Sequence, residues 1–257
     1  IGPSRPTADY LMLFSTASVG GLAKHDDSYI TGRLQLNWKA TDDVLLYGSW
    51  SRGKKSAGFN NGFLDQTQVF GNNPVGSVPF GTETLDAYEL GVKSTVLSAT
   101  TRLNASVFYY DYKDFQTFQW LILNQVIFNT DAEVYGAELE IDSRPIEGLT
   151  LQAGLGLLHA TADDIPTITG DAVREREMVG APDLSLDALV RYEWPALGGT
   201  LALQASGSYH EDIWYDIQNH PVSHENGYTL VNFRGSYTSG DRAWELYAYV
   251  NNTIEEE

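Results

Sequence analysis

The stretch VYGAELEID, residues 134–142, alternates apolar and polar side chains with a period of two. One face of an extended chain would carry the apolar residues Tyr135, Ala137, Leu139 and Ile141. The other face would carry the three carboxylates Glu138, Glu140 and Asp142. Buried charges are costly without partners, so this row does not suit the core of a soluble protein. It suits a wall between lipid and water, and predicts a strand of a transmembrane barrel.

The same alternation recurs along the chain, and no helical stripe of useful length interrupts it. We count about ten such strands, most of them near ten residues or longer. Strands in globular proteins usually have about 5–6 residues, whereas a strand tilted across a bilayer needs about 9–11. A soluble antiparallel sheet with one wetted face would show the same alternation and remains an alternative.

Short and long connections alternate between the expected strands. The tight links are 40–43, 98–101, 145–148, 195–199 and 239–242. The long polar links are 53–82, 113–133, 163–181 and 218–226. In an antiparallel meander this order places all tight turns at one end and all long loops at the other. That is the layout of an outer-membrane barrel, with periplasmic turns and extracellular loops.

The composition limits the possible functions. The chain of 257 residues has 34 acidic and 16 basic side chains, which argues against nucleic-acid binding. It has no cysteine, which excludes disulfides and thiolate metal sites. No GxSxG, HExxH or phosphate-loop motif is present, so we expect neither an enzyme nor a cofactor.

The histidines do not by themselves indicate a metal site. His210, His220 and His224 lie close in sequence, beside several carboxylates. His210 belongs to a strand and the other two to a loop, so their spacing does not imply convergence. The acidic stretch 161–172 lacks the ligand order of a calcium-binding EF-hand and is interpreted as a solvated loop. No metal site is predicted.

Four stretches together resemble the barrel of TonB-dependent outer-membrane receptors, of the type that takes up iron complexes. They are LLYGSWSRGKKSAGFN (45–60), TETLDAYELGVKSTVLSATTRLNASVFYYDYKDFQTF (82–118), NTDAEVYGAELEIDSRPIEGLTLQAGLGLL (129–158) and ELYAYVNNTIEEE (245–257). The resemblance implies a 22-stranded barrel around an N-terminal plug domain, located in the bacterial outer membrane. Residues 29–257 would be the C-terminal portion of that barrel, and residues 1–28 the remainder of an extracellular loop. The plug domain and the last strand are then expected to be absent from this chain.

The resemblance further implies a function. Such a receptor binds a scarce nutrient, most often a ferric siderophore, and imports it with energy from TonB, which acts through the plug. Outer-membrane lipid and lipopolysaccharide are the other expected partners. A passive porin-like channel and a soluble β-sandwich binding module are the alternatives.

Seven residues are candidates for facing the ligand. A basic entrance with aromatic and amide side chains near it suits an anionic, partly aromatic ligand such as a ferric siderophore. The candidates are Arg52, Lys54, Lys55, Phe59, Asn60, Phe118 and Trp120.

Overall fold

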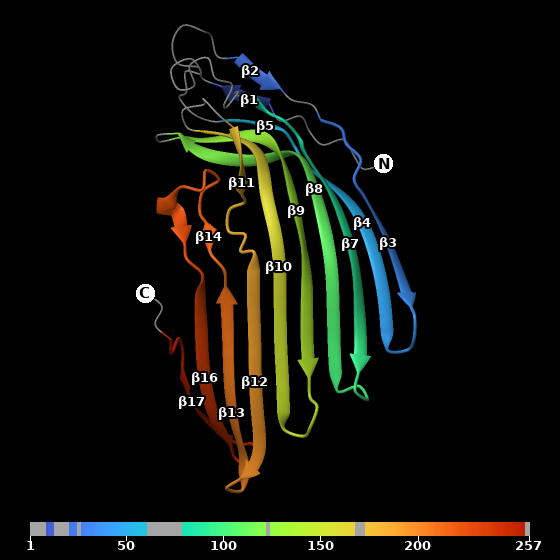
Figure 1. Ribbon diagram of the computed structural model, residues 1–257, viewed down its shortest axis with the longest axis vertical. Coiled ribbons are helices and arrows are strands. Elements are labelled where there is room, and N and C mark those ends of the chain that lie inside the picture. The colour runs from blue at the N-terminus through green and yellow to red at the C-terminus, as the bar shows by residue number, and fades with distance from the viewer. Residues whose placement is uncertain are drawn as a thin grey trace.

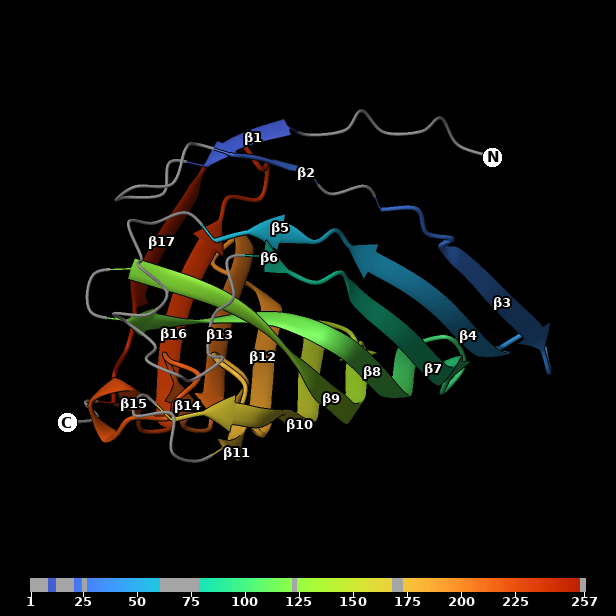
Figure 2. The ribbon, with the colours of Figure 1, turned by 90° about the horizontal axis from the view of Figure 1, so that it is seen from above.

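A computed structural model describes residues 9–12, 21–24, 27–60, 79–121, 124–167 and 173–254. Ten strands form the main path of an eleven-stranded antiparallel sheet, and each of them pairs with the next along this path (Figure 1). They are β3 (Gly32–Lys39), β4 (Val44–Lys55), β7 (Glu83–Val96), β8 (Thr101–Leu121), β9 (Asn124–Ser143), β10 (Leu149–Pro166), β12 (Leu184–Ala196), β13 (Gly199–His210), β16 (Tyr228–Thr238) and β17 (Glu245–Val250). The sheet is a curved, open wall with β3 and β17 at its edges, as Figure 2 shows from above. The predicted all-β antiparallel barrel portion of about ten strands is confirmed.

Short elements lie at one end of this wall. Strand β11 (Val173–Glu177) pairs with the outer end of β10. Three small hairpins complete the described chain: β1 (Asp9–Met12) with β2 (Gly21–Lys24), β5 (Gly58–Phe59) with β6 (Pro79–Phe80), and β14 (Ile213–Trp214) with β15 (His224–Glu225). The 3₁₀ turn η1 (Pro221–Ser223) links β14 to β15. Among the described residues, no helix is long and apolar enough to cross a membrane.

The tight turns lie where the sequence predicts them, all at the end of the wall opposite these short elements (Figure 1). Leu197 and Gly198 both have positive φ, 54° and 75°, and connect β12 to β13 as a two-residue hairpin turn. Gly148 has a φ of 80°, and a Cβ there would lie 2.1 Å from the carbonyl oxygen of Glu193. Glycine is therefore required at that turn.

The long links differ from the prediction. The sequence predicts a loop over residues 113–133, but β8 and β9 extend into this range and pair with each other from Phe115–Thr130 to Leu121–Asn124. A bulge between Tyr112 and Phe115, with Asp114 at a φ of 55°, shifts the register there. The extra residue breaks the period of two, so the alternation of the sequence does not predict a strand beyond it. Likewise, residues 163–181 contain the end of β10 and all of β11.

The register aligns an aromatic row on the outer face. Trp50, Tyr88, Tyr109 and Tyr135 lie opposite one another on four neighbouring strands, and His159 continues the row on β10. The next outward row is charged, with Arg52, Asp86, Asp111 and Glu133 in register. Aromatic rings prefer the interface between hydrocarbon and headgroups. The row therefore marks the extracellular edge of the apolar band.

A second aromatic group lies near the tight turns. The rings of Tyr192 and Trp194 stack with centroids 5.6 Å apart, and those of Tyr237 and Trp244 are 5.3 Å apart. Between the two groups the outer face is apolar. The wall thus has the two aromatic girdles and the intervening band of a transmembrane barrel.

Leu155 lies on the outer face within this band, so replacing it tests the assignment of the two faces. We expect Leu155→Arg to lower the free energy of unfolding by about 2–4 kcal/mol, the cost of a cation facing hydrocarbon near the membrane centre. Guanidinium unfolding of the intact protein in lipid vesicles measures this. Gln152→Arg, three residues away on the inner face, is the matched control and should cost much less. Equal costs for the two variants would contradict the assignment.

Candidate functional site

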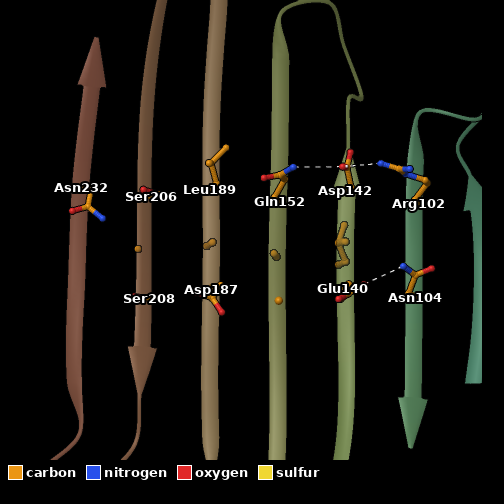
Figure 3. A pocket seen from close by; sticks show the side chains of 15 residues that line it. Arg102, Asn104, Glu140, Asp142, Gln152, Asp187, Leu189, Ser206, Ser208 and Asn232 are labelled. Carbon is orange, nitrogen blue, oxygen red and sulfur yellow. Dashed lines mark hydrogen bonds and ion pairs between the residues drawn. The ribbon is translucent and has the colours of Figure 1, made fainter. Parts of the chain in front are cut away.

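The inner wall holds a polar depression of about 690 Å³ that extends across β8, β9, β10, β12, β13 and β16 (Figure 3). Its charged and amide side chains include Arg102, Asn104, Glu140, Asp142, Gln152 and Asp187. They face the same side because directly opposed residues of an antiparallel sheet share a face. Asp142 accepts from Arg102 at 3.0 Å and Glu140 accepts from Asn104 at 3.1 Å. The wall is thus fixed by bonds between neighbouring strands.

The inner wall is acidic. In the depression, three carboxylates accompany one cation, and that cation, Arg102, pairs with Asp142. Nearer the extracellular end, Glu138 and Glu89 lie on the same face, and Glu89 accepts a 2.5 Å hydrogen bond from the Tyr47 hydroxyl. Glu140 is therefore bonded by an amide and Glu89 by a hydroxyl, and neither forms an ion pair with a described cation. This surface is chemically suited to contact a partner rich in cations or hydrogen-bond donors.

At the extracellular end, the wall is covered by residues 113–133 of β8 and β9, which we call the curled hairpin. In Figure 1 it bends away from the wall at this end, and in the view from above in Figure 2 it extends over β12, β13 and β16. Its inward residues Phe128 and Ala132 pack with Ala162 and Ile165 of β10 and with Ile217. These five side chains form a small buried core on the concave side. The curled hairpin is therefore packed in place across the mouth.

Side-chain amides fasten one side of the curled hairpin. The Gln116 Nε2 atom donates to the carbonyl oxygens of Ser56 and Gly81, each at 2.9 Å. Asn60 pairs with the backbone of Ile127, donating to its carbonyl and accepting from its N–H, both at 2.7 Å. Amides suit this role because each one can donate and accept at the same time. The curled hairpin is thereby joined to the segments around β5 and β6.

The other side is fastened by the segment between β14 and β15. Gln218 donates to Gln119 Oε1 at 2.6 Å and to the Pro166 carbonyl at 2.8 Å. Asp216 holds this segment together by accepting from the backbone N–H of Gln218 at 2.8 Å, and it also bonds Ser223 and His220. Burial would raise the pKa of Asp216, but these hydrogen bonds outweigh it and hold the pKa below its ordinary value.

The three basic candidates for facing the ligand lie on different faces of the wall. Arg52 lies on the outer face and forms a two-bond ion pair with Asp86, at 2.8 and 2.6 Å. Lys54 follows on the same outer face, opposite Thr84. Lys55 lies on the alternate face, 3.9 Å from Glu83. Arg52 and Lys54 thus face the membrane boundary rather than the lumen.

The other four candidates lie on the curled hairpin or at the end of β5. Asn60 bonds Ile127, which pairs with Phe118 in register, and Phe59 is the last residue of β5, directly before Asn60. Phe118 and Trp120 are 43% and 61% exposed, whereas Gln119 between them is 3% exposed. The two rings therefore lie on the side of the curled hairpin that faces away from its core.

The three histidines do not converge. His210 bonds Ser185 at 3.3 Å, His220 bonds Asp216 at 3.0 Å, and His224 bonds Asp212 at 2.8 Å. Within the described residues, no group of three His, Asp or Glu side chains is arranged to hold a metal ion. Of the acidic stretch 161–172, the structure describes residues 161–167. Residues 161–166 are the end of β10, and Thr167 follows this strand.

The fold and its two faces define a transmembrane β-barrel wall. Residues 9–252 match the family model described as TonB dependent receptor-like, beta-barrel. The chain belongs to this family, whose barrels lie in the outer membrane of Gram-negative bacteria.

Solved structures show the same fold. The chain is similar to the ferric yersiniabactin uptake receptor FyuA from Yersinia pestis, with a TM-score of 0.69, 21% identity and coverage of 91% of this chain and 34% of that one. It is also similar to BauA, the ferric preacinetobactin receptor from Acinetobacter baumannii, with a TM-score of 0.63, 17% identity and coverage of 93% and 33%. The copper transporter OprC matches with a TM-score of 0.62, 16% identity and coverage of 98% and 37%. The chain spans about a third of the length of these proteins.

Gln116 is the amide that tests how the curled hairpin is held. We expect Gln116→Leu to remove the two hydrogen bonds from Gln116 to the carbonyl oxygens of Ser56 and Gly81, at a cost of about 0.5–1.5 kcal/mol for each bond. Hydrogen exchange at residues 79–82 and 115–121 of the intact protein should become faster. Gln125→Leu is the control, because Gln125 is an exposed residue of the same hairpin. Unchanged exchange in Gln116→Leu would show that these bonds do not hold the hairpin.

Asp216 makes the β14–β15 segment sensitive to acid. A lowered carboxyl pKa means that its stabilisation is fully present above the unfolded value, about 3.9, and is lost as the pH falls through the folded value. Protection factors for residues 213–225 should therefore be constant between about pH 7 and pH 5 and should fall below about pH 4. Asp216→Asn should have lower protection at neutral pH and should lose this pH dependence. An unchanged profile in the variant would refute the assignment.

Proposed function

We propose that this chain is the C-terminal barrel portion, residues 29–257, of an outer-membrane receptor that imports a ferric chelate with energy from TonB. The observation that carries the proposal is the curled hairpin, packed and hydrogen-bonded across the mouth above a polar inner wall. A passive pore needs an open aqueous path, whereas a receptor needs a surface at the mouth that contacts its cargo. The covered mouth favours the receptor over the porin-like channel.

The soluble β-sandwich is the weaker alternative. A sandwich would bury one face of the sheet in an apolar core. Here the inner face carries carboxylates, and the outer face carries large exposed apolar side chains, including Leu34, Leu36, Leu90 and Leu203. An apolar face of this extent is stable in lipid rather than in water. In this proposal residues 1–28 are the remainder of an extracellular loop, and the protein makes and breaks no covalent bond.

The outer charged row supports a contact with lipopolysaccharide. Arg52 and Lys54 lie just beyond the aromatic row, at the depth of the lipid headgroups. Phosphates of lipopolysaccharide are anions that such cations bind. In this proposal, the two cations hold the barrel at its lipid boundary.

Uptake by cells tests the proposed function. A strain lacking the gene should lose uptake of one radiolabelled ferric chelate from a panel that includes catecholates and hydroxamates, and the restored gene should recover it. Deletion of TonB should abolish the same uptake, because transport by such a receptor needs energy. Copper belongs in the panel because one structurally similar protein is a copper transporter. Uptake that persists without TonB would favour the passive channel.

A further inference from the structure

A groove of about 430 Å³ lies across β9, β10, β12, β13 and the start of β16. Its floor is formed by Ala153, Ala188 and Gly207, which lie directly opposite one another on β10, β12 and β13. Directly opposed residues share a face, and Ala153 lies two residues from Leu155 of the outer face, so the floor faces the membrane. We call this depression the outer groove.

Larger apolar side chains line the outer groove beside its floor. Leu155, Leu186 and Tyr209 form the next row toward the extracellular end, and they are also in register with one another. Ile141 of β9 lies opposite Ala153 and closes one end of the floor. Small residues in one row and large ones in the next leave a trough between them. The outer groove therefore follows from the order of side-chain sizes in neighbouring strands.

Tyr209 indicates the leaflet in which the outer groove lies. A Cβ at Gly227 would lie 3.2 Å from the Tyr209 hydroxyl oxygen and 3.0 Å from the His210 carbonyl oxygen. Gly227 directly precedes β16, at the extracellular end of the wall. The Tyr209 ring thus extends from the groove toward that end, with its hydroxyl at the depth of the lipid headgroups. The outer groove lies in the outer leaflet, below those headgroups.

Hydrocarbon must fill the outer groove, because its lining is apolar and it opens to the membrane. Its volume is within the range of about 300–1,000 Å³ that ligand sites occupy. A chain lying in the groove contacts the floor and the wall together, and so gains more dispersion contacts than a chain beside a flat surface. The outer leaflet of a Gram-negative outer membrane consists of lipopolysaccharide, whose saturated acyl chains suit a straight groove.

We propose that the outer groove binds an acyl chain of a lipopolysaccharide molecule, with the headgroup of that lipid above Tyr209. This site goes beyond the proposed function, because it is occupied whether or not cargo is present. It is also separate from the charged row that contains Arg52 and Lys54, since β7, β8, β9 and β10 lie between β4 and β12 in the sheet.

Native mass spectrometry of the intact protein, purified from outer membranes in mild detergent, counts the bound lipopolysaccharide and identifies it by mass. We expect wild type to retain this lipid. Ala153→Leu/Ala188→Leu should retain about tenfold less, because the two larger side chains fill the space that the acyl chain occupies. Both alanines are exposed, so the change leaves the buried core intact. Ala248→Leu, opposite Gly235 on the outer face of β17, is the matched control and should retain as much as wild type.

The single variant Ala188→Leu should retain an intermediate amount, and guanidinium unfolding of each variant checks that the barrel is folded. Wild type that retains no lipopolysaccharide, or a double variant that retains as much as wild type, would overturn the site. Loss of the lipid in Lys54→Gln, with full retention in the double variant, would assign binding to the charged row alone and would also overturn it. A bound phospholipid, or a second copy of the chain, that depends on the two alanines would refute the proposal by identifying another occupant.

Discussion

The wall depends on one constraint, which is that a single layer of backbone separates hydrocarbon from water. In lipid every backbone N–H and C=O must be bonded within the protein, and long paired strands meet this need. The thirteen-residue pairing of β7 with β8, from Thr84–Lys113 to Val96–Thr101, is one such ladder. Because side chains alternate, the same ladder places Leu90 and Val107 outside and Glu89 and Phe108 inside. The two environments of the protein thus follow from a period of two.

The same constraint explains which parts of the fold can be predicted from the sequence alone. The order of Leu139, Glu140 and Ile141 is enough to predict the two faces of β9. The positions of the tight turns follow from the spacing of the strands. The aromatic row needs the structure, since bringing Trp50 and Tyr135 into one row requires the offset of four strands against one another. A single sequence contains each strand's pattern but not those offsets.

The mouth was predicted less well for a physical reason. Beyond the bulge at Asp114 the curled hairpin is held by Gln116, Asn60 and Gln218, whose partners are 35 or more residues away. Amide side chains carry no periodic signal, so their bonds could not be inferred from spacing. Arg174 and Arg176 do have a signal, the alternating RERE of residues 174–177, but this stretch was interpreted as part of a loop. The contacts of the residues at the mouth could therefore be identified only from the structure.

The arrangement of charge connects the wall to the mouth. Glu140 and Asp187 make the inner wall acidic, whereas Arg52 is paired on the outer face and Lys54 lies on that face as well. An anion entering such a barrel would meet unfavourable potential unless cations lay on its path. Arg174 and Arg176 are cations at this end, paired in register with Ile165 and Ala162 of the core that fixes the curled hairpin.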